Sequence, residues 1–238
     1  MKKVAVVTGA FGGIGYDILK AFDEADYAVV ALSRTAESDQ NKLKLSAIGG
    51  YFKLGIACDV TDSEQVERAV NIITAEFGKI NVLVNCAGSS QGIAHNNFTA
   101  LTDQIFDSII QTNLRGTWTM TRTVIPHLTD DSVIVNISSA SGIRWGGSNI
   151  AYASAKAGVD SMTRNLARAL APKTRVVSIA PGAVDTGFAP GANYQQAIAT
   201  TPLGRIATPS DISHMVMSVV NSKFLTGNTI VVDGGRGI

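Results

Sequence analysis

The sequence has few of the residue types that build disulfides, metal centres and charged surfaces. Its 238 residues include two cysteines, three histidines and 16% charged residues. A formal net charge of +1 argues against a general electrostatic grip on nucleic acid or an anionic membrane. Cys58 and Cys86 lie beside apolar runs, which favours buried reduced thiols over a disulfide or metal pair. His95, His127 and His214 lack the spacing typical of a metal site, so we expect no metal.

Long apolar runs and low-complexity stretches are also missing. The start, Met1-Lys2-Lys3-Val4, leads directly into a strand-like run without a signal-peptide pattern, and no apolar run is long enough to span a bilayer. We therefore expect a cytoplasmic protein. The length suits one large α/β domain with a single core, and composition shifts nowhere along the chain. We expect a single domain over residues 1–238.

Short β-branched runs alternate with helix-like segments. The runs are apolar throughout, as expected when both faces of a parallel sheet are covered. We predict helices at about 13–25, 63–77, 102–126, 151–171 and 209–220, with Ser63 and Asp211 as first-turn or cap residues. Region 33–50 is expected to hold a loop and a short helix, and 183–203 a mobile loop that touches substrate. The predicted strands are Val4–Val7, Ala28–Leu32, Phe52–Ala57, Val82–Val84, Val133–Ile137, Val176–Ile179 and Thr229–Val232. This order predicts a Rossmann-type doubly wound parallel sheet of about seven strands, with helices on both faces.

A glycine-rich turn follows the first strand in Thr8-Gly9-Ala10-Phe11-Gly12-Gly13-Ile14-Gly15. Such a turn lets a pyrophosphate approach the backbone, and the following helix directs free N–H groups at that anion. The spacing differs from G-x-G-x-x-G, and glycines also serve simple turns. The position directly after the first strand favours dinucleotide binding.

The end of the second strand indicates which dinucleotide is bound. An enzyme that prefers NAD usually has an acid there, about 20 residues after the glycines. Ser33 stands at that position here, and Arg34 follows it. An arginine can pair with the 2′-phosphate of NADP, so Arg34 favours NADP(H), although a solvated loop arginine is the alternative and NAD(H) stays open.

Tyr152 and Lys156 are four residues apart, so they share one face of the predicted helix. Alone, this pair is weak evidence. Ser139 lies thirteen residues before Tyr152, at the end of a predicted strand, where open α/β sheets place their ligands. Strand alternation is expected to point the neighbouring Ser138 to the other face. We therefore favour Ser139 as the functional serine.

The ordered motifs resemble those of the short-chain dehydrogenase/reductase family, in its compact single-domain branch, over essentially the whole chain. Cys86 stands where the family has a second asparagine, which is a mild departure. The matching segments are Thr8–Gly15, Asp59 in Cys58-Asp59-Val60, Asn85-Cys86-Ala87-Gly88, Asn113, Ser139, Tyr152, Lys156, Pro181-Gly182 with Thr186, and the ending Gly227–Gly235.

The resemblance implies an oxidoreductase that moves a hydride between the nicotinamide and a small carbonyl or secondary alcohol. Tyr152 would be the general acid, and a Lys156 ammonium would lower the pKa of Tyr152 from its usual value of about 10. Ser139 would bind the substrate oxygen, and Asn113 would hold a water in a proton relay. The implied cofactor-binding residues are Gly9, Phe11, Gly12, Gly13, Ile14, Gly15, Ser33, Arg34, Asp59, Val60, Asn85, Ala87, Gly88, Tyr152, Lys156, Pro181, Gly182, Val184 and Thr186.

Substrate contacts are expected from Ser139, Ser141, Arg144, Trp145 and Tyr152. Arg144 is a candidate for a carboxylate or phosphate, or else a solvent-facing or subunit-contact residue. Trp145 could stack on a ring or form one wall of an apolar pocket. A 3-oxoacyl thioester reductase and a non-catalytic cofactor sensor are the alternatives. The resemblance also implies a homotetramer or homodimer.

Overall fold

The computed structural model describes residues 2–50, 52–188 and 194–238. Its parallel sheet has seven strands in the order β3-β2-β1-β4-β5-β6-β7, which confirms the predicted fold class. The strands are β1 (Val4–Thr8), β2 (Ala28–Ser33), β3 (Lys53–Ala57), β4 (Ile80–Asn85), β5 (Leu128–Ile137), β6 (Thr174–Pro181) and β7 (Thr229–Val232). The order reverses between β1 and β4, and such a reversal opens a crevice at the carboxyl ends of the strands.

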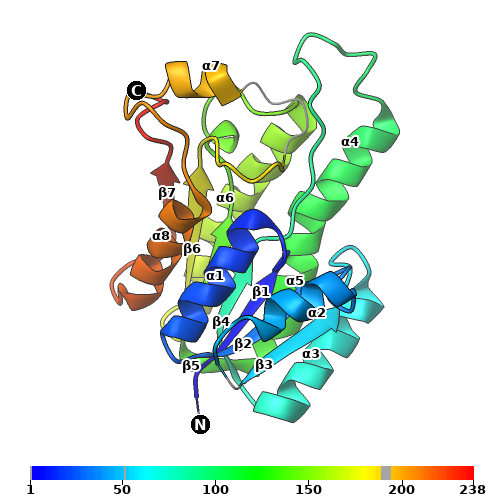
Figure 1. Cartoon of the computed structure of the whole chain (residues 1–238), viewed down its shortest axis with the longest axis vertical. Helices are drawn as coiled ribbons and strands as arrows, with labels where there is room; N and C mark the ends of the chain where they lie inside the picture. The colour runs from blue at the N-terminus through cyan, green and yellow to red at the C-terminus, as the bar shows by residue number, and fades with distance from the viewer. Residues whose placement is uncertain (1, 51, 189–193) are drawn as a thin grey trace.

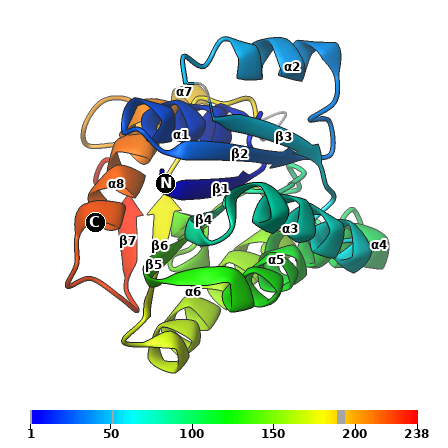
Figure 2. The same cartoon turned by 90° about the horizontal axis from the view of Figure 1, so that it is seen from below.

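Helices cover both faces of the sheet (Figures 1 and 2). The helices are α1 (Gly13–Glu24), α2 (Asp39–Ser46), α3 (Ser63–Phe77), α4 (Asp103–Ile110), α5 (Gly116–Val124), α6 (Ile150–Leu170), α7 (Tyr194–Ala199) and α8 (Pro209–Asn221). Helices α1 and α8 pack on one face, over a cluster that includes Ala5 and Val7. Helices α3, α5 and α6 pack on the other face, over a cluster that includes Val4 and Val6. Successive β1 residues thus point to opposite faces, and both faces are buried.

The predicted helix over 102–126 is not continuous. A π-helical turn, η1 (Gln111–Arg115), separates α4 from α5, and a 3₁₀ turn, η2 (Ile125–His127), follows α5. Within η1, the Asn113 side chain donates to the Ile109 carbonyl oxygen at 2.9 Å. A side chain that takes the carbonyl of residue i−4 competes with the helical backbone bond, which explains the local widening.

Two segments outside the five main predicted helices also contain a helix. Helix α2 is the short helix expected within 33–50. The loop predicted over 183–203 is partly wrong because α7 lies inside it, although residues 189–193 fall outside the described chain. A six-residue helix is too short to reveal a periodic pattern. Of the predicted cap residues, Ser63 is the first residue of α3, whereas Asp211 forms a capping box with Thr208.

Phe22 gives a direct test of the α1 packing. Its side chain is fully buried. Its ring packs edge-on against the Tyr27 ring, with 5.0 Å between the ring centroids. We expect Phe22→Ala to lower the free energy of unfolding by about 3–5 kcal/mol because it leaves a cavity. Denaturant titration measures the change. Leu43→Ala, at a side chain that is 71% exposed, is the control and should change stability by less than about 0.5 kcal/mol.

Candidate active site

The glycine turn allows very close backbone packing. Gly9 has a φ of 64°, and a Cβ there would lie 2.8 Å from the Ala87 Cα. At Gly15, a Cβ would lie 2.3 Å from the Gly9 carbonyl oxygen. Gly12 caps α1 without a side-chain hydrogen bond, which leaves the first N–H groups of the helix available to an anion. Phe11 and Ile14 pack against the core beneath the turn.

The end of β4 is held against this turn. The backbone N–H groups of Cys86 and Ala87 both donate to the Thr8 hydroxyl oxygen at 3.0 Å. Asn85 donates through its side chain to Thr121 and Asn136 at 3.0 and 2.9 Å. Asn85 therefore ties the end of β4 to α5 and β5. Ala87 packs against Gly9 of the glycine turn.

Arg34 and Asp59 follow the ends of β2 and β3. Arg34 is exposed and forms no ion pair with any residue that the structure describes. The Ser33 hydroxyl lies 3.4 Å from the Thr35 hydroxyl.

Asp59 is half-buried and accepts hydrogen bonds from the Thr61 N–H and hydroxyl at 2.9 and 2.8 Å. Val60 is buried, and its side chain fills the space in which Gly116 would carry a Cβ.

Tyr152 lies near the start of α6. Asn149 caps that helix, because its side-chain oxygen accepts the Tyr152 N–H at 2.8 Å and its amide donates to the Gln91 carbonyl oxygen at 2.7 Å. Burial raises the pKa of Tyr152 to about 12, although a side-chain hydrogen bond with Ser139 acts in the opposite direction. Ser138, by contrast, is buried and donates to the Lys156 carbonyl oxygen at 3.1 Å. The structure thus brings Ser139, and not Ser138, to the tyrosine hydroxyl.

Lys156 is buried one turn after Tyr152. Its Nζ donates to the Ile137 carbonyl oxygen at 2.8 Å and lies 5.6 Å from the centroid of the Tyr152 ring. Burial lowers the pKa of Lys156 to about 8, and the charges of Cys86 and Asp160 oppose that shift. Lys156 is not among the groups that shift the pKa of Tyr152, because burial and the charge of Cys86 raise that pKa and the hydrogen bond with Ser139 lowers it. The expected effect of Lys156 on Tyr152 stays a prediction.

Asn113 faces the same space from the π-helical turn. Its Nδ2 donates to the carbonyl oxygens of Ser89 and Ile109 at 2.8 and 2.9 Å, whereas its buried Oδ1 has no partner among the described residues. A Cβ on Gly88 would lie 2.8 Å from that Oδ1 and 3.8 Å from the Lys156 Nζ. Glycine at 88 therefore leaves open a small polar space between Asn113 and Lys156.

The segment after β6 closes over the glycine turn. The Gly182 N–H donates to the Val232 carbonyl oxygen at 2.9 Å, and Val184 forms an isolated parallel bridge with Ala207. A Cβ on Gly13 would lie 2.7 Å from the Thr186 Cγ2, so Thr186 rests directly on the turn. Pro181 is the last residue of β6.

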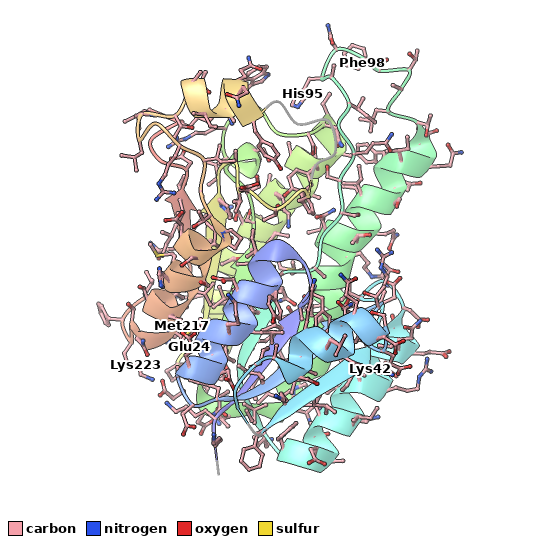
Figure 3. The ribbon with its side chains drawn as sticks, viewed as in Figure 1. Glu24, Lys42, His95, Phe98, Met217 and Lys223 are labelled. Atoms are coloured by element: carbon pink, nitrogen blue, oxygen red, sulfur yellow. The ribbon has the colours of Figure 1, made fainter. Side chains whose placement is uncertain are left out.

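Three of the expected substrate residues, Ser141, Trp145 and Arg144, each make a different kind of contact. Ser141 donates to the Ser139 hydroxyl oxygen through its N–H at 3.2 Å and its hydroxyl at 2.8 Å. Trp145 is 92% exposed, so in this chain it forms no wall of an apolar pocket. Its ring centroid lies 5.9 Å from that of His95. Figure 3 shows His95 at the end of the molecule where α7 lies. Arg144 forms an ion pair with Asp233.

Sequence reasoning missed two neighbours of Tyr152. The ring centroids of Phe188 and Tyr152 lie 5.9 Å apart. No sequence pattern relates these two residues. Asn149, three positions before Tyr152, could have been found from the preference of asparagine for helix N-caps.

Comparison with known proteins identifies the family of this chain. A family model described as enoyl-(acyl carrier protein) reductase matches residues 9–236. The chain belongs to the short-chain dehydrogenase/reductase family. It is therefore an oxidoreductase of a family that uses NAD(P)(H).

Relatives of this short-chain dehydrogenase/reductase include several reductases. The granaticin polyketide synthase putative ketoacyl reductase 2 of Streptomyces violaceoruber is 33% identical over 98% of this chain and 95% of its own. A 3-ketoacyl-(acyl-carrier-protein) reductase from Brucella melitensis, solved with NADH, has a TM-score of 0.91 at 31% identity, over 99% of this chain and 98% of its own. A variant of ElxO with NADPH bound has a TM-score of 0.88 at 27% identity, over 99% of each chain.

Metal and membrane features do not accompany this site. Within residues 2–50, 52–188 and 194–238, no group of three or more His, Cys, Asp and Glu side chains could hold a metal ion. No helix in these same ranges is long and apolar enough to cross a membrane. Both cysteines are free, with Cys58 buried and Cys86 half-buried.

The glycine turn can be tested by adding one methyl group. We expect Gly15→Ala to weaken NADPH binding at least about tenfold, because its Cβ would overlap the Gly9 carbonyl oxygen and displace the turn. Fluorescence titration with NADPH measures the affinity, and circular dichroism checks the fold. Gly49→Ala is the control, since its Cβ would lie outside the turn and 3.9 Å from its nearest neighbour, the Asp23 Oδ2. Equal affinities in both variants would contradict this account of the turn.

Proposed function

We propose that this short-chain dehydrogenase/reductase is an NADP(H)-dependent oxidoreductase that interconverts a small carbonyl compound and its secondary alcohol. One observation carries the proposal: Ser139, Tyr152, Lys156 and Asn113 surround one space at the carboxyl ends of β4 and β5. This combination of a hydroxyl donor, an adjacent hydroxyl and a buried ammonium suits proton transfer to a carbonyl oxygen. A non-catalytic sensor would not need it.

The residues present fit a dinucleotide. The glycine turn has no Cβ in the path of a pyrophosphate, and the first N–H groups of α1 lie behind it. Asp59 and Val60 would border the adenine, and Ala87, Gly88, Pro181, Gly182, Val184 and Thr186 would border the nicotinamide side. The unpaired Arg34 guanidinium would bind the 2′-phosphate that distinguishes NADP from NAD.

Tyr152 is the proposed proton donor. When bound, the dinucleotide supplies the hydride that reduces the carbonyl carbon. Tyr152 donates its hydroxyl proton to the carbonyl oxygen, and Ser139 holds that oxygen with a hydrogen bond. A pKa near 12 means that Tyr152 carries its proton at neutral pH and is in the protonated form that a donor requires. Lys156 and Asn113 border the path along which Tyr152 regains its proton.

Names of relatives suggest the substrate class. One relative is named as a putative ketoacyl reductase of a polyketide synthase, and a similar solved structure is named as a 3-ketoacyl-(acyl-carrier-protein) reductase. A 3-oxoacyl thioester is therefore the first substrate to test, followed by simple ketones, diketones and sugar-derived carbonyls. Purified protein with each compound and NADPH or NADH, followed by absorbance, measures activity and cofactor preference together.

Assembly and location complete the proposal. Phe106 and Trp118 on α4 and α5 are partly exposed apolar side chains, as a subunit contact would require. We propose a homotetramer, with a homodimer as the alternative, and a cytoplasmic location.

Tyr152→Phe tests the proton donor. We expect turnover to fall at least about a hundredfold because the variant lacks the acidic hydroxyl, whereas NADPH affinity should stay within about twofold. Steady-state rates and NADPH titration measure the two quantities. Tyr16→Phe, which changes a tyrosine on α1, is the control. Retained turnover in Tyr152→Phe would refute the assigned role.

Arg34→Gln tests the cofactor preference. A charge-assisted bond to the 2′-phosphate contributes about 1.5–3 kcal/mol, so the KM for NADPH should rise roughly ten- to a hundredfold. The KM for NADH should not change. Arg164→Gln, at an exposed position on α6, is the matched control. An equal change in both KM values, or no change in either, would refute the assignment of Arg34 to the 2′-phosphate.

A further inference from the structure

Arg144 is paired with a carboxylate from the end of the chain. Its Nη1 lies 3.1 Å from the Asp233 Oδ2, and the side chains of Arg144 and Asp233 are 36% and 10% exposed. The other carboxylate oxygen, Oδ1, accepts the Gly235 N–H at 3.0 Å. Both oxygens of Asp233 are therefore bonded within the protein. A shielded pair of this kind orders the groups that it joins more effectively than an exposed surface pair does.

Arg144 belongs to the same short turn as Ser139. The Arg144 N–H donates to the Ala140 carbonyl oxygen at 2.9 Å, and the Gly142 N–H donates to the Ser139 carbonyl oxygen at 2.9 Å. Ser141 donates twice to the Ser139 hydroxyl oxygen. Few backbone torsions remain free between Ser139 and Arg144, so a displacement of Arg144 would be transmitted to Ser139.

Asp233 lies on a turn that contacts two other parts of the site. A Cβ on Gly182 would lie 2.9 Å from the Asp233 Cα, so this turn touches the Pro181–Gly182 segment. On its other side, the Leu203 N–H donates to the Gly234 carbonyl oxygen at 3.2 Å. The turn therefore bridges the end of β6 and the segment that follows α7.

The last residues of the chain cover the guanidinium. A Cβ on Gly237 would lie 1.2 Å from the Arg144 Nη1, so the backbone at this position passes directly over the charged group. Any larger residue at 237 would displace the arginine. Covered by Gly237 and bound to Asp233, the Nη1 has little capacity left for another anion.

We propose that Arg144 is a positioning residue that fixes the Ser139 turn, through Asp233, to the Pro181–Gly182 segment and the chain after α7. This inference rests on the proposed function, because it concerns the placement of Ser139.

Two substitutions and their combination test this coupling. Arg144→Met keeps the apolar stem without the charge, and Asp233→Asn keeps the size of the side chain. In each variant we expect kcat to fall about tenfold, because a small displacement of Ser139 misaligns the carbonyl oxygen. The double variant should be no slower than either single variant, since both changes break the same link. Arg144→Lys should recover part of kcat. Lys173→Met is the control, because it removes one partner of the exposed ion pair between Lys173 and Asp130. It should leave kcat unchanged.

Substrate charge separates positioning from anion binding. The KM values for a neutral carbonyl compound and for a carboxylate-bearing analogue should both stay within about twofold of the parent values in Arg144→Met. A rise in KM for the carboxylate-bearing compound alone, in Arg144→Met and not in Asp233→Asn, would overturn the proposal. Independent, multiplying losses of kcat in the double variant would overturn it as well.

Hydrogen exchange tests the same link without turnover. We expect faster amide exchange in peptides covering 139–145 and 201–205 in both Arg144→Met and Asp233→Asn, and no change in Lys173→Met. Unchanged exchange at 201–205 in both variants would overturn the coupling. If the parent protein reduces no carbonyl compound, the proposed function fails, yet the exchange measurement still decides whether Arg144 and Asp233 hold these segments together.

Discussion

The Thr8 hydroxyl holds together the two strand ends on which the candidate site is built. By accepting the N–H groups of Cys86 and Ala87, it brings the ends of β1 and β4 into backbone contact where the strand order reverses. Such contact is possible only because residue 9 is glycine. The same close packing recurs where Thr186 rests on Gly13 and where Asn113 faces Gly88. The site is therefore built largely from backbone surfaces, which a flat dinucleotide can approach closely.

A buried polar network fixes the helices beneath this surface. Asn85 and Asn136 are register partners on β4 and β5, and their side chains are joined at 2.9 Å. Asn85 also reaches Thr121 on α5, and Asn136 reaches Thr163 on α6. Burying amides in a core is costly unless they are paired, but paired amides have directions that apolar contacts lack. The helix that carries Tyr152 and Lys156 is thus fixed in rotation as well as in distance from the sheet.

The strands could be predicted because both faces of the sheet are buried, which leaves unbroken apolar runs such as Val4–Val7, the predicted strand that lies within the fully buried β1. The π-helical turn could not, since it depends on a side-chain bond from Asn113 to Ile109 that competes with the helical pattern. Tyr152, Lys156 and Ser139 followed from their spacing and from the end of a predicted strand, whereas Asn113 followed from the family resemblance. The pairing of Arg144 with Asp233 joins residues 89 positions apart, and no local pattern encodes it. The burial of Tyr152, which raises its pKa, is likewise a tertiary property that no local pattern encodes.

Burial acts on the two ionisable groups of the site in opposite senses. It raises the pKa of the acid Tyr152 to about 12 and lowers that of the base Lys156 to about 8, because in each case it disfavours the charged form. The chain alone therefore stabilises a neutral tyrosine, which can donate a proton but accepts one poorly. Oxidation of an alcohol would require positive charge closer to the Tyr152 oxygen, yet the Lys156 Nζ is engaged with the Ile137 carbonyl oxygen. The Oδ1 of Asn113, which has no partner among the described residues, lies near the backbone of Gly88, as does the Lys156 Nζ. A proton that leaves Tyr152 would be replaced most directly from that side, through the polar space between Asn113 and Lys156.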